Sequence, residues 1–346
     1  MKTYRIVLCG YGNVGRIFVK LLETKKLQLA EKYNINPQVS AIIEWDGASV
    51  AHSGSSLPLQ SLTTLGDGVR ISALGEYWHD GAKLNDILSQ IEADVLIEAS
   101  TLNIVDGEPG MTHITTGLER GLHIITVNKG PLVVDYQKLD QLAKRKSLSL
   151  LFSGAVGAAL PCIELGQQVL IGCDIVRIDA LLNLTSNYIL TELEDPDKSY
   201  MQVLKECQRI GVAEADPHMD VDGWDSACKL TIIANSVLGI PTKLEHLRVT
   251  STSSISAAER AKAAEHGAVI RQIAVAEKDG NNYKLEVGPQ WIGVDHPLRH
   301  LSSHHLGIAY KTDTMDTMVV TTEILQGTLS TAAAILRDLI NIARAS

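Results

Sequence analysis

A buried strand that runs directly into a glycine-rich turn is the feature that most constrains the fold of this chain. Ile6-Val7-Leu8-Cys9 is an unbroken apolar run, typical of a strand buried on both faces of a parallel sheet. Gly10-x-Gly12-x-x-Gly15 follows, and residues 16–22 then have the spacing of a helix. In this context the glycines permit a tight turn, close approach of a pyrophosphate and packing of the helix on the strand. We therefore expect a dinucleotide-binding turn with the phosphates at the helix N-terminus, where Asn13 and Val14 also lie; a plain glycine-rich turn is the alternative.

Strands and helices continue to alternate through the first part of the chain. Apolar runs at 39–43, 95–98, 123–127 and 148–152 read as strands, and helical patterns cover 16–31 and 112–120. This alternation predicts a parallel sheet with helices on its faces. Past about residue 155 the pattern changes to an α+β type, and residues 331–342 have the spacing of a closing helix. We predict an α/β fold with a Rossmann-type domain over 1–153, a second α+β domain over 154–310 and a C-terminal segment over 311–346.

Composition excludes several classes of protein. The 346 residues include 31 Lys+Arg and 40 Asp+Glu, a net charge of −9, which argues against nucleic acid or an anionic membrane as partner. We find neither a membrane-length apolar run of about 18 residues nor the apolar stretch of a signal peptide, so we expect a cytoplasmic protein. The 5 cysteines form no CxxC pair and are expected to be buried thiols in a reducing compartment.

An acidic residue ends the second predicted strand and bears on the choice of dinucleotide. The Glu44 carboxylate can accept hydrogen bonds from ribose hydroxyls and would repel a 2′-phosphate. The first Lys or Arg after Glu44 is Arg70, so no cation close in sequence offsets that repulsion. We therefore favour NAD over NADP as cofactor. NADP stays possible, because Arg16 or a residue distant in sequence could reverse this preference.

Two segments carry lysines in positions suited to chemistry. Lys129 follows a predicted strand, so it can point into the crevice at the carboxyl edge of the sheet; a surface lysine is the equal alternative. The second segment, 211–230, places Asp225 and Lys229 one turn apart on a helix that begins near Trp224. An exposed ion pair is the common outcome of such spacing. Five carboxylates in this segment would repel one another unless a cation joins them, and the lysine could pass a proton to a carbonyl oxygen as hydride reaches the carbon.

A third cluster could bind metal. His300, His304 and His305 lie close in sequence. Their spacing fits neither a zinc-binding helix nor a zinc finger. We predict a solvated loop and no metal site.

Taken together, these motifs resemble the homoserine dehydrogenase family. The similarity extends over nearly the whole chain, and its most specific part is the acidic segment up to Lys229. The chain resembles short forms of the family, in which no regulatory domain is expected after Ser346. The matching segments are 10–16, 98–101, 106–109, 126–129, 187–190, 211–230 and 295–298.

The resemblance implies a reversible reaction in which L-homoserine and NAD(P)+ give L-aspartate 4-semialdehyde, NAD(P)H and a proton. Lys229 would donate and accept the proton, Asp225 would orient the reacting group, and Glu214 would hold the substrate ammonium. It further implies a catalytic second domain through which the chain forms a homodimer, and a C-terminal segment that returns to the nucleotide domain. The other residues carried over are Thr185 and Asp220 at the substrate, Lys129 between substrate and nicotinamide, and Ser100, Thr101, Gly211 and Gly327 at the cofactor.

The chain departs from the family pattern near the substrate. Leu184 stands where the family has a glycine, Val212 replaces a usual tyrosine, and Ser153 replaces a carboxylate that some members offer to a monovalent cation. These changes leave two other functions open: a dehydrogenase for a different small hydroxy acid or hydroxy amino acid, and a non-catalytic nucleotide-binding protein.

Overall fold

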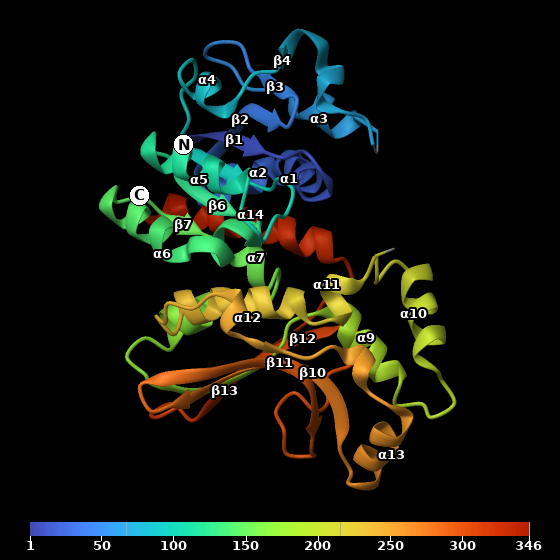
Figure 1. Ribbon diagram of the computed structural model, residues 1–346. Helices are drawn as coiled ribbons and strands as arrows, with labels where there is room; N and C mark the ends of the chain where they lie inside the picture. The colour runs from blue at the N-terminus through green and yellow to red at the C-terminus, as the bar shows by residue number, and fades with distance from the viewer. Residues whose placement is uncertain (67, 215, 346) are drawn as a thin grey trace. The chain divides into compact units, whose positions relative to one another are not determined.

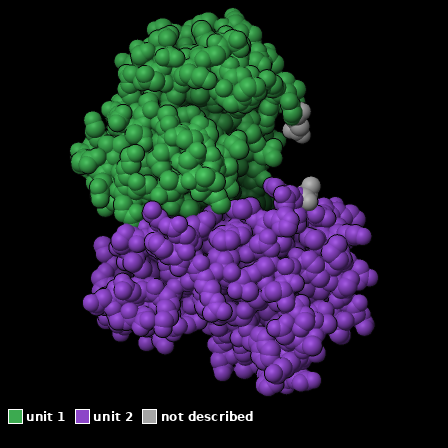
Figure 2. Space-filling model, in the orientation of Figure 1, with its two compact units in different colours: residues 1–159, 326–346 green, residues 160–325 purple. Residues whose placement is uncertain are grey.

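The computed structural model describes residues 1–66, 68–214 and 216–345 and divides into two units. The first comprises Met1–Ala159 with Gln326–Ser346, and the second comprises Leu160–Leu325 (Figure 2). The boundaries predicted after residues 153 and 310 therefore fall after residues 159 and 325 in the structure. Helix α7 (Ser153–Val156) packs on the C-terminal helix and stays with the first unit, whereas the hairpin that ends at Glu323 belongs to the second sheet.

The first unit is built on a seven-stranded sheet in the order β4-β3-β2-β1-β5-β6-β7 (Figure 1). β1 pairs in parallel with β2 and β5, and the parallel pairing continues through β6 to β7. This confirms the Rossmann-type sheet. β3 and β4 extend it as antiparallel strands that the sequence analysis did not identify. The strands are β1 (Lys2–Cys9), β2 (Ile35–Glu44), β3 (Gly47–Val50), β4 (Trp78–Asp80), β5 (Val95–Glu98), β6 (His123–Thr126) and β7 (Leu150–Leu151).

Helices cover this sheet. The prediction of one continuous helix from 16 to 31 is wrong. The helix is interrupted at Lys25, which caps the end of α1 and the start of α2 with φ −102° and ψ 9°. Among the described residues, we find no helix with the length and apolar character that crossing a bilayer requires. The helices of this unit are α1 (Asn13–Thr24), α2 (Lys26–Tyr33), α3 (Leu59–Thr64), α4 (Leu84–Leu88), α5 (Gly110–Glu119), α6 (Lys129–Arg145), α7, and α14 (Gly327–Ala345), with a 3-10 turn at Ile71–Tyr77.

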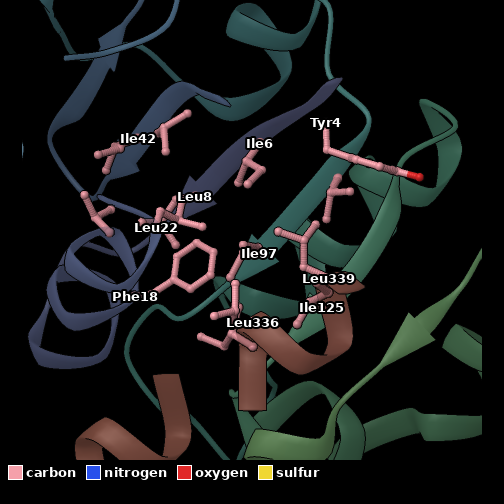
Figure 3. Packing of buried hydrophobic residues seen from close by; sticks show 14 of the residues in the cluster. Tyr4, Ile6, Leu8, Phe18, Leu22, Ile42, Ile97, Ile125, Leu336 and Leu339 are labelled. Atoms are coloured by element: carbon pink, nitrogen blue, oxygen red, sulfur yellow. The ribbon is translucent and has the colours of Figure 1, made fainter. Parts of the chain in front are cut away.

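The core of the first unit joins the two ends of the chain. Phe18 and Leu22 of α1 pack with Leu336 and Leu339 of α14 against the apolar side chains of the central strands (Figure 3). The C-terminal helix therefore completes the core of the N-terminal sheet, and burying this aliphatic surface stabilises the unit.

The second unit contains a six-stranded sheet in the order β13-β12-β8-β10-β11-β9. Two of its helices lie on one face of the sheet, because the Gln272 side chain on β10 accepts hydrogen bonds from Ser186 of α9 and Ser226 of α12. The strands are β8 (Ile175–Leu181), β9 (Arg248–Val249), β10 (Val269–Asp279), β11 (Asn282–Ile292), β12 (His305–Thr312) and β13 (Thr317–Glu323). The helices are α8 (Cys162–Glu164), α9 (Leu184–Glu192), α10 (Tyr200–Arg209), α11 (His218–Val221), α12 (Trp224–Ser236) and α13 (Ala257–Glu265), with short turns at Leu165–Val169, Leu244–His246 and Thr252–Ser254.

Candidate active site

The glycine-rich turn of the first unit has the geometry of a phosphate cradle. Gly10 adopts φ +94°, and a Cβ there would lie 2.4 Å from the Ala99 carbonyl oxygen. A Cβ on Gly15 would lie 2.5 Å from the Gly10 carbonyl oxygen, so close packing requires glycine at both positions. At Gly12, by contrast, a Cβ would meet no described heavy atom within 4 Å. This open position stands before the first turn of α1, whose unpaired N–H groups attract an anion.

A cavity of about 720 Å³ adjoins this turn and is formed by residues of the first unit alone. Glu44, at the end of β2, lines it, and its carboxylate accepts a hydrogen bond from the Tyr11 backbone N–H. Gly10, Gly12, Ser100 and Thr101 of the predicted cofactor residues also line it. Asn13, Val14 and Gly15 lie in the first turn of α1 and are not among its lining residues.

Two cations distant from Glu44 in sequence lie in this region, one on the cavity and one against the residues that follow Glu44. Lys83 lines the same cavity, and the Arg70 guanidinium lies 5.0 Å over the ring of Trp45 and pairs with Asp46. Arg16 instead stacks 4.7 Å over the Tyr11 ring. The fold therefore brings positive charge into this region, although the sequence has no Lys or Arg between Glu44 and Arg70.

A buried carboxylate beneath this cavity was missed by the sequence analysis. Glu98 ends β5 with 0% exposure and accepts hydrogen bonds from the Ser100 backbone N–H at 2.8 Å and from the Ser100 hydroxyl. It also meets His113 Nδ1 at 2.6 Å and Asn128 Nδ2 at 3.2 Å. Glu98 thereby fixes the loop after β5 and the cap of α6. In the sequence, Glu98 ends an apolar strand and opens the matching segment 98–101, but neither feature indicated this role.

Lys129 begins helix α6 directly after β6 and is half-buried. Asn128 caps this helix by accepting the Gly130 N–H at 3.0 Å, which fixes where the helix starts. Lys129 thus stands at the carboxyl edge of the parallel sheet, where ligands of such sheets bind.

The second unit brings Lys229 and Asp225 together as a buried pair. Lys229 Nζ donates to Asp225 Oδ2 at 2.6 Å and to the Leu182 carbonyl at 2.7 Å. Their side chains are 14% and 12% exposed, so this is not the exposed pair that such spacing usually gives. Helix α12 starts at Trp224 because Gly223 precedes it at φ +89°, and this start places Asp225 in the first turn.

Asn183 joins this pair to a second carboxylate. Its Nδ2 donates to Asp220 Oδ1 at 2.7 Å and to Asp225 Oδ2 at 3.0 Å. Thr185 donates its hydroxyl to Asp220 Oδ2 at 2.7 Å. Four predicted residues, Lys229, Asp225, Asp220 and Thr185, therefore form one network around Asn183, which the sequence analysis did not single out.

The other acidic side chains of the 211–230 segment lie outside this network. Asp222 accepts from Ser251 at 2.7 Å and meets His218 Nδ1 at 3.0 Å. Protein donors therefore contact the carboxylates of Asp220, Asp222 and Asp225. Glu214 is exposed, and its backbone carbonyl accepts from Gln208; Ala215 beside it lies outside the described residues. Gly211 follows α10 with φ +76°, and Gly327 begins α14 in the first unit.

Comparison with known proteins decides the family. The sequence model of homoserine dehydrogenase matches residues 161–340. The chain is 32% identical over 339 residues to the homoserine dehydrogenase of Methanocaldococcus jannaschii, covering 97% of this chain and 98% of that protein. The chain belongs to the homoserine dehydrogenase family.

Two further relatives agree. The NAD(+)-dependent homoserine dehydrogenase of Pseudomonas canavaninivorans is 28% identical over 352 residues, covering 99% of this chain and 97% of the relative. The crystal structure of a homoserine dehydrogenase from Thiobacillus denitrificans matches with a TM-score of 0.83 at 25% identity, covering 99% of this chain and 74% of that chain. The family assignment therefore rests on sequence and fold together.

The departures from the homoserine dehydrogenase pattern have distinct surroundings. Leu184 is the half-buried first residue of α9. Val212 packs on the apolar cluster beneath α9 and α10, and its backbone carbonyl oxygen lies 3.1 Å from the Thr185 hydroxyl oxygen, whose single hydrogen is directed to the nearer Asp220. Ser153 donates its hydroxyl to buried Asp338 at 2.7 Å, which ties α14 to α7. Leu184 and Val212 therefore alter the residues beside Thr185, whereas the Lys229–Asp225 pair is intact.

The histidine cluster is occupied by hydrogen bonds. His305 Nδ1 meets the Ser302 hydroxyl at 2.6 Å, and the backbone carbonyls of both residues accept from Asn187. Among the described residues, Cys9, Glu98 and His113 are the group close enough to resemble metal ligands. Burial, with Glu98 and Glu44 nearby, raises the pKa of the Cys9 thiol well above its usual range.

Proposed function

We propose that the protein is a homoserine dehydrogenase that interconverts L-homoserine and L-aspartate 4-semialdehyde with a nicotinamide dinucleotide. In the oxidative direction, the C–H bond at the hydroxyl carbon breaks as hydride leaves and the O–H proton passes to a base, so NAD(P)H, a proton and the aldehyde result. The observation that carries this proposal is the buried pair of Lys229 and Asp225, bonded at 2.6 Å and joined through Asn183 to Asp220.

Lys229 is proposed to donate the proton to the aldehyde oxygen and to take it back from the hydroxyl. The bonds to Asp225 and to the Leu182 carbonyl hold the Lys229 nitrogen in place and direct two of its three N–H groups. A positioned lysine can then transfer the proton as charge develops on the oxygen. Asp225 keeps the ammonium oriented and balances its charge.

The substrate ammonium is proposed to be held by acidic groups of the same unit. Asp220 and Asp225 contribute two negative charges against the one positive charge of Lys229, so an added cation is electrostatically favourable. Each oxygen of Asp220 accepts one protein donor and keeps a lone pair for another. Glu214 would complete the clamp, and Thr185 fixes the position of Asp220.

The cofactor is proposed to occupy the cavity of the first unit, with NAD preferred over NADP. The open position at Gly12 and the N-terminus of α1 fit a pyrophosphate, and Glu44 fits ribose hydroxyls. The bound nicotinamide supplies or takes up the hydride. Gly10, Gly15, Ser100, Thr101, Gly211 and Gly327 would adjoin the cofactor, and Lys129 would meet both cofactor and substrate.

A substrate panel tests the proposed function. Purified protein is assayed with NAD and NADP on L-homoserine, on L-serine and on four- and five-carbon hydroxy acids that lack the amino group. We expect turnover on homoserine well above every other compound. A homoserine rate near background together with rapid turnover of another compound would favour the alternative substrate that Leu184 and Val212 leave open. Cofactor binding without oxidation of any compound would favour a non-catalytic nucleotide-binding protein.

A homodimer formed through the second unit is also proposed. β13 is the edge strand of the six-stranded sheet and pairs with β12 on one side. Val319 on this strand is 41% exposed, and an open strand edge can pair with the same edge of a second copy. Sedimentation velocity of the parent and of Val319→Lys tests the dimer. The variant should shift toward monomer, and a parent protein that is already monomeric would contradict the proposal.

A further inference from the structure

A second cavity lies in the second unit, among residues that the proposed reaction does not use. Its volume is about 490 Å³. It is formed by the end of α9, helix α13 and the start of β10, together with Arg299 from the segment after β11. Most of its lining side chains are apolar, chiefly Leu190, Leu193, Ile270 and the alanines of α13.

The charges on this cavity are unbalanced. Among the described residues, those that line the cavity and carry a charge are Glu194, Arg260 and Arg299. Glu194 is already paired, because its carboxylate accepts from Nη2 of buried Arg271 at 2.5 Å. For Arg260 and Arg299, no described carboxylate forms an ion pair. Two guanidinium groups therefore border an apolar cavity without an anionic partner in a protein whose net charge is −9.

A hydrogen-bond donor in this region also lacks an acceptor. Nε of Arg299 is covered by protein and has no partner among the described residues. Arg260 directs Nη1 to the Leu193 carbonyl at 2.8 Å. Arg299 and Arg260 both line the cavity, and no described carboxylate pairs with either of them, so their positive charge favours an anionic ligand there.

We propose that this cavity binds a small aliphatic monocarboxylate, held by Arg299 and Arg260. A carboxylate matches the planar donor fork of a guanidinium and takes paired, charge-assisted hydrogen bonds from it. The tail would then lie against Leu190, Leu193 and the alanines of α13, where burial of apolar surface adds to binding. Inorganic phosphate fits less well, because the wall that faces away from the arginines offers it few donors.

Probes that share one tail and differ in head group test this proposal. Valerate, 1-pentanol and pentylamine are compared on the full chain by saturation-transfer NMR and calorimetry, with inorganic phosphate as a fourth probe. We expect valerate to bind and the other three to bind at least about tenfold more weakly, the loss typical of a missing charged hydrogen bond. Equal binding of valerate and pentanol, or tighter binding of phosphate, would overturn the proposal.

Variants then locate the bound carboxylate. Arg299→Met keeps much of the side-chain length but removes the charge, and should weaken valerate at least about tenfold, while Arg299→Lys should weaken it less. Ala264→Met fills the cavity from α13 and should abolish binding even if Arg299 variants fold poorly. Arg248→Met, an exposed arginine on β9, is the matched control and should bind as the parent does. Unchanged valerate binding in Arg299→Met would refute the site. Dissociation of an oligomer by Ala264→Met would also refute it, because the cavity would then be a contact between two copies of the chain.

Discussion

Lys229 donates to a carboxylate and to a backbone carbonyl, and this fixes the nitrogen that we propose as proton carrier. Its replacement separates proton transfer from cofactor binding, because the cavity that we propose for the cofactor is formed by residues of the other unit. Lys229→Ala should lower kcat by about two to four orders of magnitude, as loss of general acid–base catalysis does, with NAD affinity nearly unchanged. Steady-state kinetics and a cofactor titration measure both. A comparable loss of cofactor affinity would contradict the role assigned to Lys229.

Asn183 is a positioning residue, since it acts on the reaction through the two aspartates that it bridges. Asn183→Ala should lower kcat by about 10- to 100-fold, the range for a lost hydrogen bond to a charged group, with the KM for cofactor unchanged. Asn183→Asp keeps the helix-capping oxygen that accepts the Ser186 N–H at 2.8 Å but puts a third carboxylate between two others, so it should be slower still.

A buried amide on the same helix provides the control for Asn183. Asn187 donates to the Ser302 carbonyl at 2.7 Å and contacts neither aspartate. Asn187→Ala should therefore lower the free energy of unfolding and leave kcat per folded molecule near that of the parent. If Asn187→Ala and Asn183→Ala lost kcat equally, the positioning role would be replaced by a general loss of structure.

Glu44 is the residue that bears most directly on cofactor preference. Glu44→Gln keeps an oxygen for the Tyr11 N–H and removes the charge that would repel a 2′-phosphate. We expect the ratio of kcat/KM for NADP to that for NAD to rise about tenfold or more, given the size of charge–charge energies near a protein surface. Glu108→Gln removes a negative charge from the same cavity and is the control. An equal rise in both variants would show an effect of net charge rather than of Glu44.

At the scale of elements, α14 matters because it brings the end of the chain into the core of the first sheet. Leu339 on this helix has 0% exposure, whereas Leu329 in its first turn has 38%. Leu339→Ala should lower the free energy of unfolding by about 2–5 kcal/mol, the cost of a lost core side chain and the cavity it leaves. Leu329→Ala should cost about 0.5 kcal/mol or less. Urea unfolding measures both, and equal losses would show that α14 is not part of this core.

At the scale of the whole molecule, each unit has an aspartate that links stability to pH. Burial acts to raise the pKa of Asp94, but hydrogen bonds and charge from Arg5 outweigh it and hold that pKa below its usual value. Asp179 is similar: burial opposes the shift, and contacts with His296 and Arg177 lower its pKa. Because the folded pKa is the lower one, each group stabilises the fold above the unfolded pKa of about 3.9 and loses this contribution as pH falls through the folded value.

Acid titration of variants tests this linkage. The difference in the free energy of unfolding between the parent and Asp94→Asn should be largest near neutral pH and should shrink as the pH falls below about 4. Asp80→Asn, at an exposed position in β4, provides the comparison and should show little difference at any pH. A difference for Asp94→Asn that stays constant down to pH 3 would be incompatible with a lowered pKa.

The sequence by itself determined the features that depend on neighbouring residues. The strand-glycine-helix order at 6–22 and the apolar run at 95–98 required a parallel sheet, and i, i+4 spacing put Asp225 and Lys229 on one helix face, because local backbone geometry fixes these relations.

Only the tertiary structure decided whether that pair is buried, which side chain joins Asp225 to Asp220, and that Arg70 pairs with Asp46. Asn183 is 42 residues from Asp225, and Arg70 reaches Asp46 across 24. Contacts at such separations depend on how sheets and helices pack. No local pattern in the chain encodes them, and the same holds for the arginine-lined cavity beside α13.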